Sequence, residues 1–425
     1  MDIWQELDWR ASIHQATDPE QLPQRLSAAS RTVYAGFDPT SDGLHVGNFV
    51  ALMMLRRFQK AGHRPIVLAG GATGMIGDPS GKSQERSLLS AEEIENNLCS
   101  ISGELQRFLD FESTPSAILV NNYDWMKTWD YLSFLRDIGK HFPVNVMLAK
   151  DSVKTRLEQT EAGMSYTEFS YMLLQAYDFV HLHNEFGCEL QIGGSDQWGN
   201  ITAGIDLGRR MGVGPLYGIT SPLLTRSDGA KMGKTEQGTI WLSPHKTSPY
   251  AFYQYWYNVN DDDVGRCLRL LTELTQEEIH SLDEDRHNDP GSRNSQRRLA
   301  ETLTEFVHGK EGLAKAGQAS QVLFGAEISE LSDQELSEIF ADVPSHTLER
   351  TELVGDGLNI IDALCSAGLA KSKSEARRTI NQGGAYVNNR RIEDADYSLS
   401  TNDLASETVM VLRAGKKRYA LLMFS

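Results

Sequence analysis

The sequence contains few cysteines, no apolar run long enough to cross a membrane near its start, and fewer basic than acidic residues. The four cysteines, at positions 99, 188, 267 and 365, are scattered without CxxC spacing. This spacing argues against a structural zinc site and a disulfide framework, and it fits a reducing compartment. The N-terminus lacks the basic start and apolar core of a signal peptide. The run Phe49–Leu55 is far too short to span a bilayer. We therefore expect a cytoplasmic protein without membrane association.

The shortage of positive charge counts against a protein that captures nucleic acid with its whole surface. The chain has 41 Lys and Arg against 58 Asp and Glu, a formal net charge of −17, and phosphate contacts depend on Lys and Arg. The charge is uneven, however. From Gly357 to the C-terminus ten basic residues stand against seven acidic ones, a net of +3, so the preceding 356 residues carry −20. The tail is predicted to be a separate, mildly basic module.

A chain of 425 residues is too long for one ordinary core. Between residues 31 and 218, short apolar strands alternate with helical stretches, which predicts an α/β fold with an open, Rossmann-like parallel sheet. The expected strands are Arg31–Ala35, Pro65–Ala69, Ala117–Asn121 and Glu189–Ile192. We expect a catalytic domain over residues 1–220, a helical domain over 221–321, an acidic linker over 322–356 and a small α+β domain over 357–425.

A glycine-punctuated turn, Gly36–Asn48, lies between the first expected strand and a helix. The N-terminus of a helix carries unpaired N–H groups and partial positive charge, so it suits a phosphate. His45 and Asn48 add donors on one side, and Gly47 allows a ligand to approach the backbone. The alternative is a surface loop with a helix-capping Asp.

The second expected strand is followed by a glycine-rich loop, residues 70–83, that superficially resembles a P-loop. Only three residues separate Gly77 from the Gly81-Lys82-Ser83 run, where a P-loop has four. We interpret it as a loop near a nucleotide, with Lys82 and Arg86 as mobile cations. A flexible connector is the alternative.

Residues 167–180 read as a helix, in which Tyr171, Gln175 and Asp178 fall on one face. Such polar groups on an otherwise apolar helix favour a lined pocket for a ligand carrying a hydroxyl and an ammonium. The alternative is the exposed face of an amphipathic helix.

Two further stretches carry polar groups next to glycine. Gln191–Asn200 repeats the order of strand, glycine, polar cluster and helix, and so suggests the second wall of a nucleotide cleft. Leu224–Glu236 has two lysines three apart on a loop, which would bring point charges to a polyphosphate. Read alone, the first is equally compatible with an ordinary connection and the second with a solvated loop.

The tail carries basic residues that would form one RNA-binding face, although solvated surface is the more common meaning of such residues. The candidates are Lys371, Lys373, Arg377, Arg378, Arg390, Arg391, Lys416, Lys417 and Arg418.

Taken together, these stretches resemble the bacterial type of tyrosyl-tRNA synthetase, a class I aminoacyl-tRNA synthetase. The sequence His45–Asn48 is similar to the HIGH motif, with Asn in place of the last His, and Lys231–Thr235 to KMSKS, with Gly and Thr in place of the two Ser. Residues from Gly357 resemble an S4 RNA-binding domain. Ala35 departs from the Cys that family members often carry at this position against the ribose.

The resemblance implies activation of tyrosine with ATP, release of pyrophosphate, and transfer of tyrosine to the 3′ end of tRNA(Tyr) by a homodimer. Mg²⁺ would accompany ATP, and neither a protein metal cage nor a tightly bound cofactor is expected. The implied catalytic residues are His45, Asn48, Lys82, Arg86, Lys231, Lys234 and Thr235. Those implied for tyrosine are Tyr34, Asp78, Tyr171, Gln175, Asp178 and Gln197, and those for ATP are Asp38, His45, Gly47, Asn48, Asp196 and Lys234.

Two alternatives stay open at this point. A tryptophanyl-tRNA synthetase is the nearest, but Tyr34 with Asp178 favours a phenol over an indole. The other is an RNA-binding protein that kept the shell of a synthetase without catalysis, against which His45, Lys231 and Lys234 argue.

Overall fold

The computed structural model describes residues 2–80, 89–150, 153–154, 156–157, 163–235, 238–323, 325–328, 331–341, 343–415 and 418–425. The chain forms two units. The first comprises residues up to Lys246 together with Val259–Leu299, and the second comprises Thr247–Asn258 together with Ala300–Ser425. Each unit has its own sheet and its own packed core.

The sheet of the first unit has the strand order β1-β6-β5-β2-β3-β4. Its strands are β1 (Gln15–Ala16), β2 (Thr32–Phe37), β3 (Arg64–Ala69), β4 (Ile118–Asn121), β5 (Cys188–Gly194) and β6 (Tyr217–Ser221). All neighbours pair in parallel except β1, which runs antiparallel to β6. The expected strands are therefore β2, β3, β4 and β5, extended by one to three residues or shortened by one.

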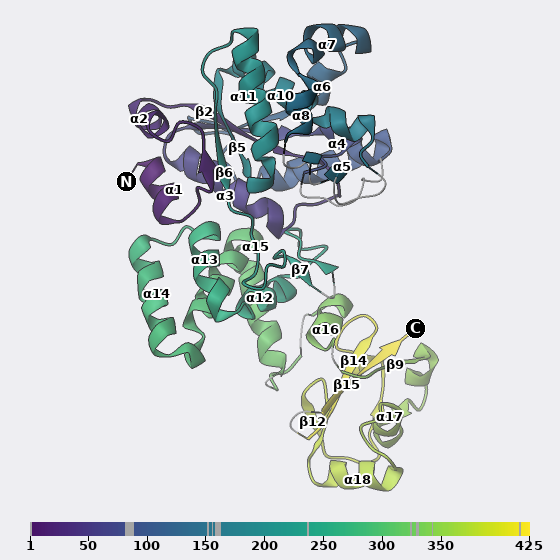
Figure 1. Ribbon diagram of the computed structural model, residues 1–425. Helices are drawn as coiled ribbons and strands as arrows, with labels where there is room; N and C mark the ends of the chain where they lie inside the picture. The colour runs from purple at the N-terminus through teal and green to yellow at the C-terminus, as the bar shows by residue number, and fades with distance from the viewer. Residues whose placement is uncertain are drawn as a thin grey trace. The chain divides into compact units, whose positions relative to one another are not determined.

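Helices cover both faces of this sheet (Figure 1). The helices of this unit include α1 (Ile3–Trp9), α2 (Gln21–Ala28), α3 (Val46–Lys60), α4 (Gly71–Ile76), α5 (Ala91–Leu105), α6 (Tyr123–Met126), α7 (Tyr131–Asp137), α8 (Val144–Leu148), α10 (Tyr166–Phe186), α11 (Trp198–Met211), α13 (Asp261–Leu271) and α14 (Gln276–Asn288). Of these, α13 packs on α3 and on α14. Helix α3 packs on β2, β3 and β5, whereas α10 and α11 pack on each other and on β5. Right-handed crossovers place α3 and α11 on opposite faces.

Burial explains why the strands read as continuous apolar runs. From Pro65 to Ala69 every residue of β3 is buried, as expected for a parallel strand covered on both faces. Helix α10 begins at a Ser165 cap whose side chain accepts the Glu168 N–H, and it ends at Gly187, which has a φ of 63°. Glycine adopts this left-handed conformation without strain.

Two buried arginines attach the segment Val259–Leu299 to the rest of the first unit. The guanidinium groups of Arg10, just after α1, and of Arg57 on α3 both donate to the carbonyls of Arg269 and Thr272 at the C-terminal end of α13, at 3.0–3.1 Å. Both side chains are almost fully buried. Cations at this end of a helix satisfy carbonyls that have no partner within the helix.

The second unit contains α12 (Pro249–Tyr257), the part of α15 (Asn294–Leu323) from Ala300 onward, α16 (Asp333–Ile339), α17 (Ile360–Ser366) and α18 (Lys373–Asn381). Its main sheet has the order β12-β11-β14-β15-β9. These strands are β9 (Ser345–Leu348), β11 (Ala385–Val387), β12 (Arg390–Ile392), β14 (Val409–Ala414) and β15 (Arg418–Phe424), while β10 (Leu358–Asn359) pairs with β13 (Ser398–Leu399). Buried side chains of α17 and α18 pack with those of β11, β14 and β15 in one core.

The expected linker, residues 322–356, includes regular structure. It contains α16, and its strand β9 pairs in parallel with β15. Leu336 and Phe340 are buried in a core that also includes Tyr250 and Tyr419. The sequence of 322–356 did not indicate this packing, because the stretch is acidic and α16 buries only a few apolar residues. The stretch expected as one helical domain, 221–321, is likewise divided between the two units.

Candidate active site

Two polar turns meet where the direction of the sheet order reverses. From β2 the chain continues outward to β3 and β4, whereas β5 lies on the other side of β2 and leads to β6. Asp38 follows β2, and Asp196 follows β5. In open α/β sheets this point, beyond the carboxyl ends of the strands, is where ligands bind.

The imidazole of His45 caps helix α3. Its Nδ1 accepts the Gly47 N–H at 3.0 Å, while the Asn48 side-chain oxygen accepts the His45 N–H at 3.1 Å. A neutral imidazole that accepts through Nδ1 carries its proton on Nε2. The turn thus combines an imidazole donor, an exposed Gly47 backbone and the positive end of a helix, a combination suited to phosphate oxygens.

These residues line a cavity of ≈ 320 Å³. Of the predicted site residues, the structure gathers around it Tyr34, Asp38, His45, Gly47, Asn48, Asp78, Tyr171, Gln175, Asp178, Asp196, Gln197, Lys231 and Lys234. Lys82 and Arg86 lie outside the described residues. Thr235 is not among the lining residues, and its hydroxyl donates to the Gly238 carbonyl at 3.1 Å.

One end of the cavity is formed by a buried carboxylate and a buried phenol. Asp178 is 1% exposed, and its two oxygens accept the Asn122 amide at 3.0 Å and the Trp125 indole N–H at 2.8 Å. Burial raises the pKa of Asp178 to about 7, although these two hydrogen bonds lower it. The Tyr34 hydroxyl is equally buried and has no hydrogen-bond partner among the described residues. The same burial, and then the charge of Asp178, raises the pKa of Tyr34.

A network of amides surrounds Asp78 further along the cavity. The Gln197 side chain donates to the Asp78 carboxylate at 2.6 Å and accepts from Gln175 at 3.2 Å. Asn200 also donates to Asp78, at 3.3 Å. Because Gln175 donates through its nitrogen, its side-chain oxygen remains an acceptor that can serve a ligand.

Asp38, in the turn after β2, accepts hydrogen bonds from two hydroxyl groups. Its two oxygens accept the Thr73 hydroxyl at 2.7 Å and the Tyr171 hydroxyl at 2.8 Å. Tyr171 therefore donates its proton to Asp38, and its oxygen is left as an acceptor. Burial, followed by the charge of Asp38, raises the pKa of Tyr171 well above the ordinary value.

The lysine loop approaches the start of α3 very closely. Lys231 and Lys234 are exposed, and between them Gly233 has a φ of 81°. A Cβ on Gly233 would lie 2.8 Å from the Val46 Cβ, so only glycine fits here. The short strands β7 (Lys234–Thr235) and β8 (Gly238–Thr239) then return the chain. Across the cavity, burial raises the pKa of Asp196.

Comparisons with known proteins show the family to which this chain belongs. Residues 27–325 match the family described as tRNA synthetases class I (W and Y), and residues 335–422 match the tyrosine–tRNA ligase SYY-like C-terminal domain. The tyrosine–tRNA ligase of Rhodopirellula baltica is 57% identical over 418 residues, covering 98% of this chain and 95% of that protein. The enzyme of Bacillus caldotenax is 48% identical over the whole length of both chains. The chain belongs to the class I tyrosine–tRNA ligase family.

A solved structure supports the same assignment. The C-terminally truncated mitochondrial tyrosyl-tRNA synthetase of Aspergillus nidulans is 31% identical to this chain, with a TM-score of 0.67. The match covers 76% of this chain and 94% of that one. The fold, the enzyme class and the family expected from the sequence are therefore confirmed.

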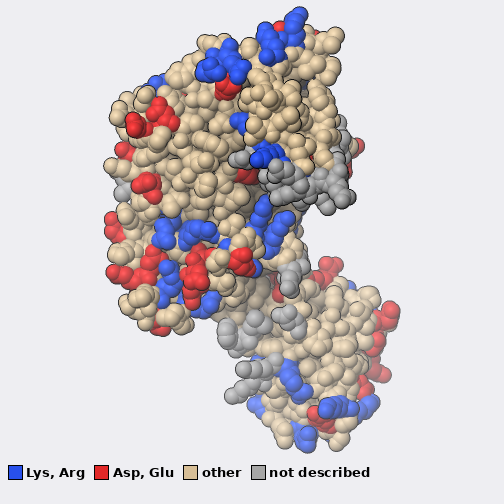
Figure 2. Space-filling model, in the orientation of Figure 1, with Lys and Arg blue, Asp and Glu red and all other residues tan. Residues whose placement is uncertain are grey.

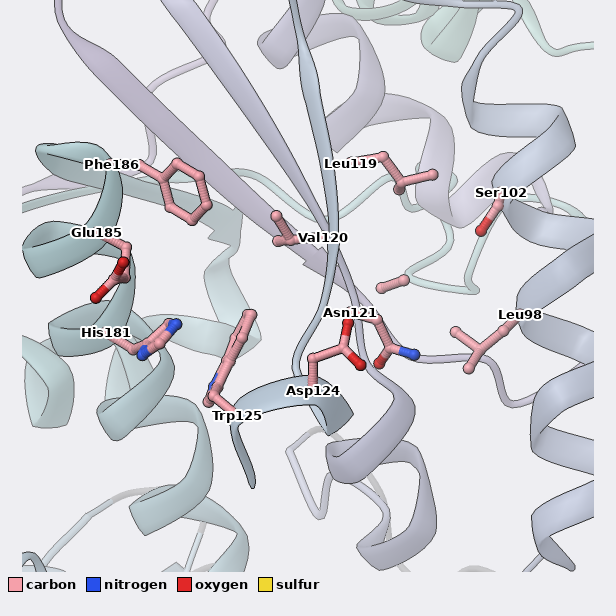
Figure 3. Close-up of a pocket in the computed structure, with 11 residues that line it drawn as sticks. Leu98, Ser102, Leu119, Val120, Asn121, Asp124, Trp125, His181, Glu185 and Phe186 are labelled. Carbon is pink, nitrogen blue, oxygen red and sulfur yellow. The ribbon is translucent and has the colours of Figure 1, made fainter. Parts of the chain in front are cut away.

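Within this tyrosine–tRNA ligase fold, a second cavity of ≈ 500 Å³ lies along the free edge of β4 (Figure 3). Leu98 and Ser102 of α5 border it on one side, and His181 and Phe186 of α10 on the other. The His181 ring stacks on Trp125, with the centroids 4.3 Å apart. Since Trp125 also bonds to Asp178, its indole separates this cavity from the first one.

The basic residues expected to bind RNA lie in the second unit. Lys371, Lys373, Arg377 and Arg378, on or just before α18, are exposed, and Figure 2 shows basic side chains on this part of the surface. Arg390 and Arg391 on β12 and Arg418 on β15 are exposed as well, whereas Lys416 and Lys417 lie outside the described residues. Several of these cations pair with carboxylates, as Lys373 does with Asp362 at 2.6 Å and Arg377 with Asp396 at 3.7 Å. The positive charge on this face is thus partly neutralised.

Several residues of the site were missed from the sequence, among them Asn200, which donates to Asp78. Asn122 and Trp125 hold Asp178, Thr73 holds Asp38, and the buried Gln191 lines the cavity. A glutamine between Leu190 and Ile192 in an apolar strand was a usable signal. The pair Asn121 and Asn122 at the carboxyl end of β4 was a second usable signal.

Proposed function

We propose that this enzyme activates L-tyrosine with ATP to tyrosyl-adenylate and then transfers tyrosine to the 3′ end of tRNA(Tyr) for protein synthesis. The observation that carries the proposal is the pairing of two buried groups at the end of the cavity: the Tyr34 hydroxyl, which has no partner among the described residues, and the Asp178 carboxyl. A substrate phenol placed between them accepts a hydrogen bond from the Tyr34 hydroxyl and donates one to the Asp178 carboxyl, so that each buried group gains a ligand partner.

This pairing explains selection against phenylalanine without an editing step. Phenylalanine would leave the Tyr34 hydroxyl and the Asp178 carboxyl buried without a ligand partner, which is energetically costly. Tyrosyl-tRNA synthetases are themselves the standard example of this effect. An indole ring has an N–H donor but no oxygen to accept from Tyr34, so tryptophan satisfies only one of the two groups.

The middle of the cavity supplies acceptors for the substrate ammonium group. The Tyr171 oxygen, the Gln175 side-chain oxygen and the Asp78 carboxylate all remain able to accept. Gln197 has a second amide hydrogen, beyond the one given to Asp78, for the substrate carboxylate. This arrangement orients the carboxylate toward the turn that carries His45.

The turn at His45 then receives the nucleotide. His45, Gly47 and Asn48 contact the α-phosphate region, while Asp38 and Asp196 line the rest of the ATP site. The positive charges of Lys231, Lys234, Lys82 and Arg86 neutralise the departing pyrophosphate. Thr235 is part of the same lysine loop, and Mg²⁺ accompanies the phosphates. The tyrosine carboxylate attacks the α-phosphorus directly, so catalysis consists of positioning and charge stabilisation, without a protein nucleophile.

Amino-acid-dependent exchange of pyrophosphate into ATP tests this proposal. We expect exchange with tyrosine, and almost none with phenylalanine or tryptophan at equal concentration. The Asp178→Asn variant should lose selectivity between tyrosine and phenylalanine. Exchange with tryptophan alone would make the enzyme a tryptophanyl type, and absence of exchange with any amino acid would indicate a noncatalytic RNA-binding protein.

The domains divide this work. Residues 1–220 hold the amino acid and ATP, residues 221–321 carry the lysine loop and helices that bind the anticodon arm, and residues 357–425 form the S4-like RNA-binding domain, with 322–356 between the last two. Among the described residues there is no helix long and apolar enough to cross a membrane, and the four thiols are free. We place the enzyme in the cytoplasm.

An exposed apolar surface supports a homodimer. It is formed by residues of α7, α8 and the start of α10: Tyr131, Leu132, Val144, Val146, Leu148 and Tyr166, of which Leu132 is 74% exposed. The hydroxyls of Tyr131 and Tyr166 are hydrogen-bonded to each other, so α7 and α10 meet here. Apolar surface of this kind marks an interface, and we assign a second copy of the chain to it.

Light scattering on the Leu132→Asp variant tests the homodimer. A charge in the centre of the interface should shift the wild-type dimer toward monomer at micromolar concentration. Val354→Asp, which places the same charge at an exposed apolar residue of the second unit, is the control. A monomeric wild type, or an unchanged Leu132→Asp dimer, would contradict the assignment.

A further inference from the structure

The segment that follows the lysine loop is attached by its backbone to the turn that carries His45. The Val46 N–H donates to the Ile240 carbonyl at 3.1 Å, and the Leu242 N–H donates to the Leu44 carbonyl at 2.8 Å. The Ile240 N–H in turn donates to the Gly233 carbonyl at 2.8 Å. The position of the lysines and the position of His45 are therefore mechanically connected through Ile240–Leu242.

Side chains reinforce this connection on the outer side of the turn. The Trp241 ring lies 6.1 Å from the His45 ring, centroid to centroid. The Lys246 ammonium lies 4.2 Å above the Trp241 ring and also forms an ion pair with Asp42. Lys246 thus contacts both the segment after the lysine loop and the turn before His45.

The turn itself is enclosed by these groups. A Cβ on Gly43 would lie 3.6 Å from Trp241 Cε3 and 3.7 Å from Lys246 Cδ, which shows how closely the two side chains cover the backbone. From the other side, the buried Glu104 carboxylate accepts the Leu44 N–H at 2.8 Å. The backbone of Gly43 and Leu44, the two residues before His45, is thus contacted by Trp241 and Lys246 on one side and by Glu104 on the other.

We propose that Lys246, Asp42 and Trp241 form a latch that positions His45 relative to Lys231 and Lys234 during adenylate formation. These three are positioning residues, because none of them lines the cavity among the residues that the structure describes. The inference rests on the proposed function, which assigns His45 and the two lysines to the phosphates of ATP. It assigns an effect on the reaction rate to three residues that lie outside the His45–Asn48 and Lys231–Thr235 motifs.

The exposure of the latch separates a positioning role from a stabilising one. The Asp42 side chain is 58% exposed and that of Lys246 is 26% exposed. Ion pairs this open to solvent contribute little to stability. A small displacement of a group that contacts the transition state, by contrast, can slow a reaction by up to about 100-fold. Loss of the latch should therefore reduce the rate without unfolding the protein.

The experiment compares Lys246→Met with wild type in tyrosine-dependent pyrophosphate exchange. We expect kcat to fall about tenfold, with little change in the KM for tyrosine or in Tm, because the groups around Tyr34 and Asp178 are untouched. Lys246→Arg keeps the cation above Trp241 and should restore most of the rate. Lys127→Met is a matched control, because Lys127 also pairs with a carboxylate, Asp124, and lies 5.5 Å above a ring, that of Tyr123.

A His45→Asn background shows whether Lys246 acts through His45. Asparagine preserves the helix cap and removes the imidazole, so in this background Lys246→Met should cost much less than it does alone. An undiminished effect, an unchanged kcat in Lys246→Met, or a loss of Tm with a parallel rise in the tyrosine KM would each overturn the latch. Failure of the proposed function is distinguishable, because the wild type itself would then show no exchange with tyrosine.

Discussion

Removal of the Tyr34 hydroxyl should change stability and affinity in opposite directions. In the ligand-free protein this hydroxyl is buried without a partner among the described residues. An unsatisfied buried polar group costs about 1–3 kcal/mol. Tyr34→Phe removes that group and leaves the ring, which packs edge-on against Phe179 with the centroids 5.2 Å apart. The variant without ligand should therefore be as stable as wild type or more stable.

Tyrosine binding should weaken in the same variant. The hydroxyl donates one neutral hydrogen bond to the substrate phenol, worth about 0.5–1.5 kcal/mol, so the Kd for tyrosine should rise about 2- to 12-fold. Phenylalanine gains nothing from the hydroxyl, so its affinity should stay the same or improve. Loss of the hydroxyl thus lowers the preference for tyrosine over phenylalanine, because tyrosine binds more weakly while phenylalanine binds as well as before or better.

Equilibrium dialysis and thermal unfolding together test the argument. Without ligand the Tm of Tyr34→Phe should equal or exceed that of wild type. Saturating tyrosine should stabilise wild type by about 0.5–1.5 kcal/mol more than the variant, because the tighter complex is stabilised more, so the Tm of wild type should rise further on tyrosine addition than that of Tyr34→Phe. Tyr217→Phe, a buried ring of β6 that does not line the cavity, serves as the control. A variant that loses both stability and affinity would show that the hydroxyl already has a partner in the free enzyme.

Three further predictions concern other parts of the molecule. Since the pKa of Asp178 is raised to about 7, the native state binds a proton more tightly than the unfolded state between about pH 4 and pH 7. The free energy of unfolding should therefore fall as the pH rises through this window, and urea titrations at pH 5 and 7.5 should show a smaller fall for Asp178→Asn. Gly233→Ala should slow exchange by more than Gly229→Ala, since both have a positive φ but only the first would contact Val46; equal rates would remove the importance of that contact. Charge reversal of Arg377 and Arg378 should reduce tRNA charging and its salt dependence and leave exchange unchanged, and a parallel loss in both assays would contradict an RNA-binding role.

The parts of the fold that the sequence predicts are those in which local chemistry and tertiary structure agree. The run Pro65–Ala69 is apolar throughout because the sheet covers it on both faces, so its pattern alone identified β3. The polar face of residues 167–180 was recognised because Tyr171, Gln175 and Asp178 repeat at helical spacing. All three line the cavity.

The rest depends on contacts between residues distant in the sequence. Trp125 and Asn122 give no periodic signal, and their importance appears only when α6 packs beside α10 and both side chains reach Asp178. Strand β9 consists of Ser-His-Thr-Leu and gains its place by pairing with β15, far along the chain. An acidic stretch without an apolar pattern therefore looked like a linker, because its order comes from its partner.

The two arginines at the end of α13 restrict how this enzyme can be shortened. Deleting Val259–Leu299 would remove the carbonyls that Arg10 and Arg57 contact, and would leave two nearly buried guanidinium groups without these acceptors. A minimal tyrosine-activating fragment must therefore include this distant segment, even though the chain that reaches it first passes through the second unit. The boundary of the smallest independently folding piece follows these hydrogen bonds and not the order of the sequence.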